Sequence, residues 1–175
     1  MPFEARSRTL ERLVSAPISV WAILLGDVIG SFLYGLLIST VPLIIGLVLG
    51  VNIIHYIVLC LGMVLAAFCF ASFGILLSAY PPTDIPATVM MVSNLVKFPL
   101  VFISGIFIPI WEIHDLGRII ASFSPLTYFT DLVNYCIKGT SYYSVLVDFI
   151  ILTGFTALFL IAAIRIHGKT LSERL

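Results

Sequence analysis

The sequence predicts an all-α membrane protein with several membrane-spanning helices. Of its 175 residues, 61% are hydrophobic and only 10% are charged, whereas soluble domains carry about 25% charged residues. A helix needs about 20 mostly apolar residues to cross a hydrocarbon core of about 30 Å. The segments that meet this requirement are residues 20–50, 54–79, 87–108 and 145–166. We therefore expect four transmembrane helices, within one integral membrane domain that covers residues 1–175.

Residues 1–17, which precede the first apolar segment, have the pattern of an amphipathic helix. Leu10 and Val14 lie on one face at helical spacing, while Glu4 and Arg8 lie toward the other. Glu4 precedes Arg8 by one helical turn, which favours an ion pair along the helix. The pattern predicts a surface helix ahead of the first span.

The segment between the third and fourth spans shows a second helical pattern. Gly105 and Pro109 break the preceding helix, and Pro125 interrupts the pattern that follows. Apolar residues recur on one face at Ile113, Leu116, Ile120 and Phe123. Polar residues share the other face at His114, Asp115, Arg118 and Ser122. We expect short outer-face helices over residues 110–138, the second running from about Leu126 to Ile137.

The placement of basic residues predicts the topology. Six of the nine Lys and Arg residues lie in the terminal segments, and only Arg118 and Lys138 lie in the long loop between the last two spans. Basic residues are enriched on the cytosolic side of a membrane. We therefore expect a multi-pass protein of the cell membrane, with both termini in the cytosol and Trp111–Ser141 outside.

The sequence gives no sign of catalysis, a metal site or a disulfide. It has no phosphate-binding Gly-Lys-Ser/Thr loop, no zinc-binding His-Glu-x-x-His motif and no nucleophile with a nearby base. The histidines have no ligand spacing. Cys60 and Cys69 lie about 13 Å apart along one helix, beyond disulfide reach, and Cys136 is expected on the outside without a partner. We expect no catalytic residue, no metal and no cofactor in this chain, and the zero net charge gives no indication of a nucleic-acid partner.

Lys97 lies near the middle of the third span. A charge at the centre of a bilayer costs about 2.5–3.5 kcal/mol, so such residues usually face a cavity or a partner. With Asn94 and Phe98 it is a candidate for a translocation path or a dimer interface. Alternatively, Lys97 extends toward the membrane surface or pairs with Asp27 or Asp148 of another span.

Two sequence blocks resemble the type-2 ATP-binding-cassette (ABC) exporter permease family. The first holds a Ser-Gly-x-Phe-x-Pro pattern and a Ser-Pro-Leu-Thr-Tyr pattern followed by Asp. Its matching residues are Ser104, Gly105, Phe107, Pro109, Pro125, Leu126, Thr127, Tyr128 and Asp131. The second block, Glu4–Leu13, is similar to the family's cytosolic Glu-x-x-x-Gly-Thr-Leu-Glu-x-Leu element, with Arg8 in place of the glycine.

The resemblance implies a permease subunit of an exporter that a separate ABC ATPase subunit energises. The partners that the resemblance implies are an ABC ATPase subunit, a second permease unit and membrane lipid. The second permease unit is either another copy of this chain or a complementary permease subunit. The residues implied in ATPase coupling are Glu4, Arg8, Thr9, Leu10, Glu11, Arg12 and Leu13. Those implied in an outer gate are Gly105, Phe107, Pro109, Pro125, Tyr128 and Asp131. Alternatively, residues 1–17 lie on the bilayer surface, and residues 111–123 form a simple interfacial anchor.

Members of this family commonly have six spans, and the resemblance covers the last four. A truncated or split permease half is therefore an alternative, and a non-transporting membrane scaffold or assembly subunit is another. The transported substrate stays open, because lipid, drug, polysaccharide and peptide exporters share this architecture.

Overall fold

The structure, a computed structural model, describes residues 20–78 and 86–172. The helix predicted for residues 1–17, with its coupling residues, lies outside these ranges. Within them every regular element is helical, which confirms the all-α prediction. The elements are α3 (Val20–Val48), α4 (Tyr56–Ser78), α5 (Pro86–Ile103), the 3-10 helix η1 (Ile110–Glu112), α6 (Asp115–Ser122), α7 (Pro125–Lys138) and α8 (Val145–Ser172).

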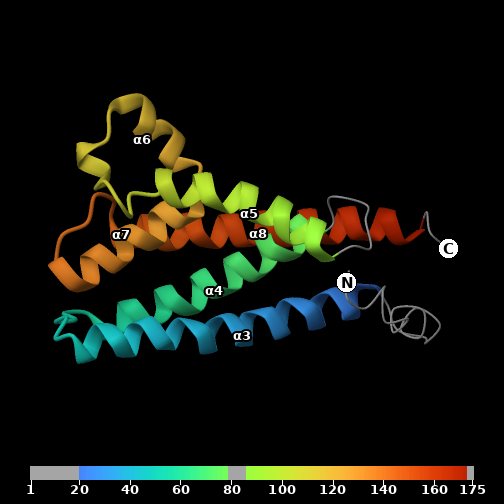
Figure 1. The fold of residues 1–175 in the computed structure, drawn as a ribbon, viewed down its shortest axis with the longest axis horizontal. Helices are drawn as coiled ribbons and strands as arrows, with labels where there is room; N and C mark the ends of the chain where they lie inside the picture. Colours follow the sequence, from blue (N-terminus) through green and yellow to red (C-terminus); the bar gives the residue numbers. More distant parts are fainter. Residues whose placement is uncertain (1–19, 79–85, 173–175) are drawn as a thin grey trace.

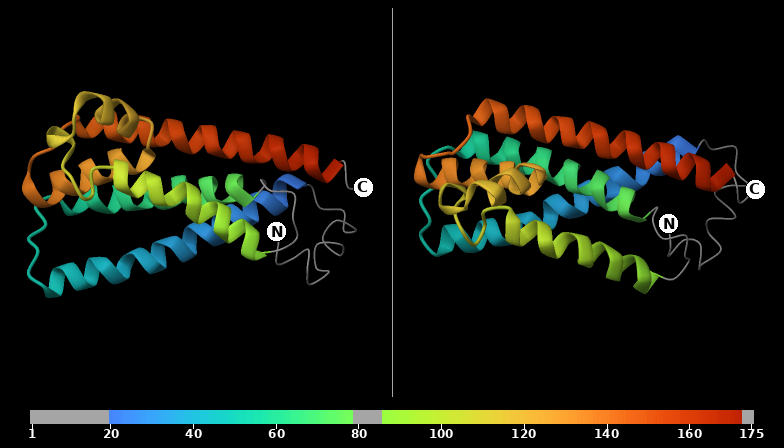
Figure 2. Two further views of the ribbon diagram at one scale, coloured as in Figure 1. Left: turned by 45° about the horizontal axis from the view of Figure 1, so that its top comes forward. Right: turned by 90° about the horizontal axis from the view of Figure 1, so that it is seen from above.

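The four long helices lie lengthwise in an antiparallel arrangement, and the short helices gather at one end (Figure 1). We call residues 104–144 the cap, and the end of the bundle that they occupy the cap end. The start of α3 and the end of α8 lie at the opposite end, as both further views also show (Figure 2). Helix α4 is the centre of the bundle, since it packs on α3, α5, α7 and α8.

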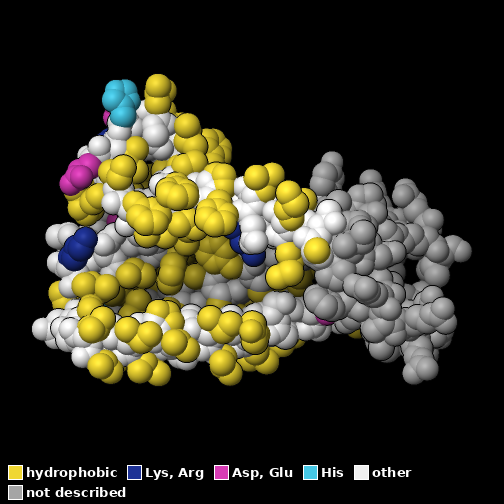
Figure 3. All heavy atoms as spheres, in the orientation of Figure 1, with side chains coloured by type: hydrophobic (Ala, Val, Ile, Leu, Met, Phe, Trp, Pro, Cys, Tyr) yellow, Lys and Arg dark blue, Asp and Glu magenta, His cyan; other side chains and the backbone are white. Residues whose placement is uncertain are grey.

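Three of the long helices have the length and composition of membrane spans. These segments are Leu25–Val48, Tyr56–Ser78 and Val145–Ile166, with mean hydropathies of 2.1, 2.4 and 2.4. Much of their surface is covered with exposed hydrophobic side chains (Figure 3), as a helix in contact with lipid requires. The chain is therefore a polytopic membrane protein.

Helix α5 is shorter than the predicted span. Its 18 residues rise about 27 Å, close to the thickness of a hydrocarbon core. The helix ends at Ile103 rather than at residue 108, because Gly105 takes a left-handed φ of +83° and reverses the chain direction. Helix α8, in contrast, continues beyond the predicted residue 166 to Ser172, since helical hydrogen bonding does not stop where the apolar composition ends.

Several small hydrophobic clusters hold the helices together. The cluster that joins α3, α4 and α8 consists of Val28, Ala71, Ile75, Ala163 and Ile164. A second cluster, of Tyr128, Leu132 and Leu152, joins α7 to α8 at the cap end. Small side chains on α4 let its neighbours approach closely, as is usual between membrane helices. This packing fixes α3, α4, α7 and α8 relative to one another.

Candidate functional site

A cleft of about 550 Å³ lies between α3, α4 and α5. Its volume is within the range of about 300–1,000 Å³ that is typical of ligand sites. The hollow between α3 and α5 is visible on the face in Figure 3. The α3 wall carries Asp27, Ser31, Gly35 and Ser39, a polar stripe in which each residue follows the last by one helical turn.

The other walls of the cleft are mostly small or apolar, with one exception. Helix α4 supplies Met63, Ala66, Ala67, Phe70, Ala71, Gly74, Ile75 and Ser78, and α7 supplies Phe129. The exception is Lys97, which comes from α5. By helix rise, its Cα lies about 16 Å from the start of α5 and about 9 Å from its end. Among the residues that the structure describes, Lys97 is thus the one basic side chain that lines the cleft, and it lies well inside the length of α5.

Neither of the two carboxylates considered as partners forms an ion pair with Lys97. Asp27 lines the same cleft from α3, whereas Asp148 is fully buried in the first turn of α8, at the cap end. Over residues 20–78 and 86–172, Arg118 forms an ion pair with Asp115, and Lys97 forms none. The ammonium group therefore needs water or an acidic ligand in the cleft.

Asn94 and Phe98, the other candidates on α5, do not line the cleft. Both side chains are exposed, Phe98 to 65%. They share one side of the helix with Lys97 by spacing but lie outside the cleft itself. A role for them in a translocation path or a dimer interface stays a prediction.

The cap begins with a tight reversal at Gly105. A Cβ atom at this position would lie 2.8 Å from Cγ1 of Ile110, and Ile110 is only 3% exposed. Pro109 precedes η1 as its N-cap residue. Phe107 points away from the cap core, since it is 63% exposed and stacks on Phe102 with 5.2 Å between ring centroids. Gly105 therefore permits the turn, and Phe107 stays on the surface.

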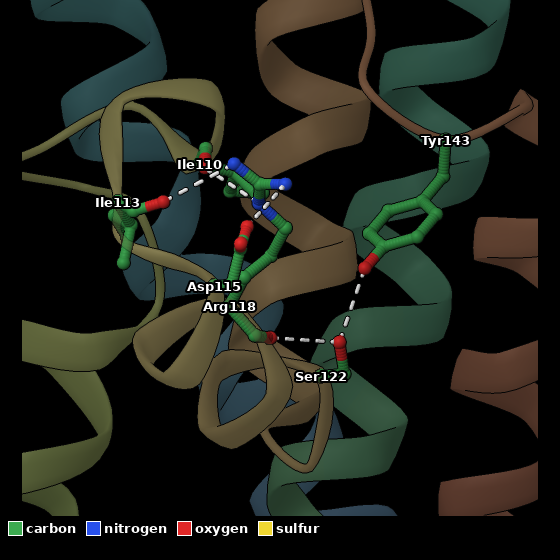
Figure 4. A network of polar contacts seen from close by, with 6 residues as sticks. All are labelled: Ile110, Ile113, Asp115, Arg118, Ser122 and Tyr143. Carbon is green, nitrogen blue, oxygen red and sulfur yellow. Dashed lines mark hydrogen bonds and ion pairs between the residues drawn. The ribbon is translucent and has the colours of Figure 1, made fainter.

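Two polar side chains of α6, Arg118 and Ser122, are turned toward the protein (Figure 4), whereas Asp115 is 85% exposed. Arg118 donates from Nη2 to the carbonyl of Ile113 at 3.1 Å and from Nε to the carbonyl of Ile110 at 3.4 Å. The Oγ of Ser122 lies 3.1 Å from the hydroxyl of Tyr143. These bonds join α6 to the 3-10 turn before it and to the connection that leads into α8.

The apolar face of α6 is turned outward. Its large exposed side chains are Leu116, Ile119, Ile120 and Phe123. The predicted division into two faces is therefore only partly present, because Asp115 is exposed together with these apolar side chains while Arg118 and Ser122 find partners within the protein.

Asp131 fixes the connection between α7 and α8. Its carboxylate is fully buried and accepts the backbone N–H of Tyr142 at 2.9 Å and that of Tyr143 at 2.7 Å. Bonds of N–H groups to a carboxylate are stronger than those between neutral groups. Asp131, expected in an outer gate, is thus at the least a structural anchor of the cap.

Helices α6 and α7 are joined by two further hydrogen bonds. The hydroxyl of Tyr128 donates to the carbonyl of Ser122 at 2.8 Å, and that of Thr127 donates to the carbonyl of Ala121 at 2.7 Å. Burial above all, and next the neighbouring Tyr143, raise the pKa of Tyr128. Its hydroxyl is therefore protonated, and a donor, at neutral pH. Pro125 occupies the first turn of α7, where a missing N–H costs nothing.

Two features of the structure were not predicted. The first is the polar stripe on α3, which its four-residue spacing in an apolar helix would have indicated. The second is the complete burial of Asp148, whose two carboxylate oxygens accept no hydrogen bond within the part of the chain that the structure describes. Sequence spacing cannot indicate that burial, because it depends on how α7 packs on α8.

The comparisons with known proteins agree with this architecture. No significant match was found among curated proteins or among solved structures. The family described as ABC-2 family transporter protein matches residues 1–165, a range that includes the cleft, the cap and nearly all of the membrane-spanning part of α8. The chain therefore belongs to the ABC-2 family of transporter proteins.

Proposed function

We propose that the chain is the transmembrane permease subunit of an exporter that a separate ABC ATPase subunit drives. Family membership supports a membrane permease of the ABC-2 type. The observation that carries the proposal for this chain is the cleft, in which a polar stripe on α3 and Lys97 on α5 lie between helices whose other faces are apolar. Such a polar-lined cavity is a suitable path for a solute that must avoid lipid.

The sparse packing of α5 supports the proposal that this helix is a movable wall of the path. To the hydrophobic clusters of the described residues α5 contributes Leu100, which is partly buried, and outside these clusters its Val89 is buried. Pro99 lies inside the helix and removes one helical hydrogen bond. We propose that α5 shifts against α4 to open and close the cleft, because such a movement would disturb little packing.

The cap is proposed to close the outer end of the path. In this arrangement both termini are cytosolic, the cap is outside the cell membrane, and Gly105, Phe107, Pro109, Pro125, Tyr128 and Asp131 belong to the outer gate. The buried contacts of Asp131 and Tyr128 support a rigid gate. The chain itself would hydrolyse nothing, since ATP hydrolysis belongs to the partner.

The complete machine would hold two permease units and ATPase subunits. The second unit is a further copy of this chain or a complementary permease subunit. Residues 4–13 are proposed to dock on the ATPase and to transmit its movement to α3. Their resemblance to the family's cytosolic element supports this assignment.

The proposal is tested by purification of the full chain, carrying an affinity tag, from membranes of its source cells. We expect a P-loop ATPase to copurify. After reconstitution of both proteins in liposomes, the rate of ATP hydrolysis should differ severalfold from that of the ATPase alone. An ATPase that copurifies but whose rate is unaffected would indicate a scaffold instead, and the absence of any ATPase would contradict the proposal.

A further inference from the structure

We propose that the cleft between α3, α4 and α5 binds an acidic amphiphile, with its anionic group beside Lys97 and its apolar chain along α4. The anionic group is a phosphate or a carboxylate. This inference rests on the proposed function, because it names the class of substrate that the permease would accept.

Lys97 supplies the positive charge that would hold the anionic group. Its side chain is exposed to the cleft, and it forms no ion pair over the described ranges. The position lies well inside α5, where an uncompensated charge is unfavourable in a membrane. An acidic ligand would neutralise the ammonium and supply oxygen acceptors for its N–H groups.

Two of the three serine hydroxyls in the described walls are already used as donors. The Oγ of Ser39 donates to the carbonyl of Leu36 at 2.8 Å, and the Oγ of Ser78 donates to the carbonyl of Ile75 at 2.7 Å. Because these donors are already used, they cannot also stabilise an anion. Among the described lining residues Lys97 is the group with a positive charge, and the Oγ of Ser31 on α3 is the remaining hydroxyl.

Asp27 lies on α3, across the cleft from α5, and has a further interaction of its own. The positive charge that an anionic group needs is therefore on the Lys97 side of the cleft. A ligand with one compact anionic group can place it there, whereas a polyanion would need further cations that the described lining residues do not supply.

The remaining walls suit an apolar chain. Met63, Phe70 and Ile75 of α4 and Phe129 of α7 line the cleft with large apolar surfaces. A polysaccharide would need many hydrogen-bond partners, and these walls do not supply them. At about 550 Å³ the volume suits a single-chain amphiphile, while a bulky peptide would exceed the usual size of such a site.

The experiment measures binding to the full chain in phosphatidylcholine nanodiscs. The probe is hexadecyl phosphate with a photoreactive diazirine in its chain. The matched probes have the same chain but end in a hydroxyl or a trimethylammonium group. We expect the phosphate probe to bind about tenfold more tightly than the alcohol, as one charge-assisted hydrogen bond would produce. Peptide mapping should place its crosslinks on α3 and α4 where they line the cleft.

Four variants test whether Lys97 causes the preference for the phosphate probe over the alcohol probe. Lys97→Met should lower the affinity for the phosphate probe to that of the alcohol, and Lys97→Arg should retain it. Asp27→Asn should bind the phosphate probe as tightly as the wild type or more tightly. Lys138→Met, which removes a basic residue of the cap, should have no effect. The elution of each variant from a sizing column confirms that it is folded.

Equal labelling by the three probes, or full binding by folded Lys97→Met, would overturn the inference. So would a cysteine at Gly35 that crosslinks to a helix of another subunit while the phosphate probe is excluded, since the cleft would then be a helix-docking surface. The measurement needs no ATPase. Binding without ATPase coupling would refute the proposed function alone, and coupling without binding would refute this inference alone.

Discussion

The carboxylate of Asp131 in α7 accepts the backbone N–H of Tyr143, 2.7 Å away, and with its other oxygen that of Tyr142. These bonds hold the turn that leads into α8. The same Tyr143 contacts Ser122 of α6 through its hydroxyl. Asp131 therefore determines, through Tyr143, how α6, α7 and the start of α8 are arranged at the cap end.

Replacement of Asp131 by Asn should loosen this turn. The amide has one oxygen and no charge, so one of the two N–H groups loses its acceptor and the other makes a weaker bond. The expected loss is about 1.5–3 kcal/mol, the usual value for a hydrogen bond to a charged group. Hydrogen exchange measured by mass spectrometry on the peptide that contains Tyr142 and Tyr143 should be at least tenfold faster.

Asp115→Asn is the matched control for this substitution. The carboxylate of Asp115 is 85% exposed and pairs with Arg118 at 3.4 Å. Exposed pairs of this kind contribute about 0–1 kcal/mol. Exchange at Tyr142 and Tyr143 should therefore stay at the wild-type rate, and equal acceleration by both variants would refute the role of Asp131.

Gly105→Ala should destabilise the junction between α5 and the cap. Alanine at a φ of +83° is strained, and its Cβ would lie 2.8 Å from Ile110. A non-glycine residue in this region costs about 1–2 kcal/mol, and the collision with a buried side chain adds to that. The unfolding temperature in detergent, followed by tryptophan fluorescence, should fall by several degrees.

Substitutions at two other glycines distinguish the backbone strain from the collision with Ile110 as causes of the lower unfolding temperature. Gly50 also has a positive φ, of +79°, but a Cβ there would meet nothing within 4 Å. Gly50→Ala should therefore show the backbone strain alone and a smaller decrease. Gly154→Ala, in the open interior of α8, should be neutral or slightly stabilising. Equal decreases for Gly105 and Gly50 would mean that Ile110 is not in contact with the turn.

Tyr128→Phe should weaken the contact between α6 and α7 and change how stability depends on pH. The variant loses the hydrogen bond to Ser122, worth about 1 kcal/mol. Burial raises the pKa of Tyr128 in the folded state, so its contribution is complete below the ordinary pKa of about 10 and is lost as the pH rises above it.

The pH dependence is measured as the unfolding temperature between about pH 9 and about pH 11. Other tyrosines and lysines titrate in this range, so the comparison of the wild type with Tyr128→Phe isolates the residue. The wild type should lose more stability than the variant over the range. Parallel curves would show that Tyr128 does not titrate with folding.

The proposed topology predicts that the cap is reached from outside the cell. Thr140 is exposed in the cap, and Ala87 is exposed at the start of α5, at the opposite end. In a background without native cysteines, Thr140→Cys should react with a membrane-impermeant maleimide in intact cells. Ala87→Cys should react only after permeabilisation. The reverse pattern would place the termini outside.

The sequence predicted the helices of the bundle well, because the length of an apolar segment is a direct physical requirement for crossing a membrane. It also predicted the break at Gly105 and the start of the last cap helix near Pro125, since both residues restrict the backbone locally. These signals depend on neighbouring residues only. The structure places α7 at Pro125–Lys138, close to the predicted limits of Leu126 and Ile137.

The orientation of α6 and the burial of Asp148 could not be predicted in this way. Helical spacing showed that Arg118 and Ser122 share a face, but not that this face is turned toward the protein. That orientation depends on Tyr143, which lies 21 residues after Ser122. Likewise, the cleft requires α3 and α5, which are distant in sequence, to face one another.

The ATP hydrolysis rate of the reconstituted complex tests whether residues 4–13 couple this permease to an ATPase, as we propose. Glu11→Lys should return this rate to that of the ATPase alone, because it reverses a charge in the proposed docking segment. Glu112→Lys, an exposed acidic residue of the cap, should leave the rate of the complex unchanged. Hydrolysis at the same rate with wild-type chain, with Glu11→Lys and without any chain would show that residues 4–13 do not couple the permease to the ATPase.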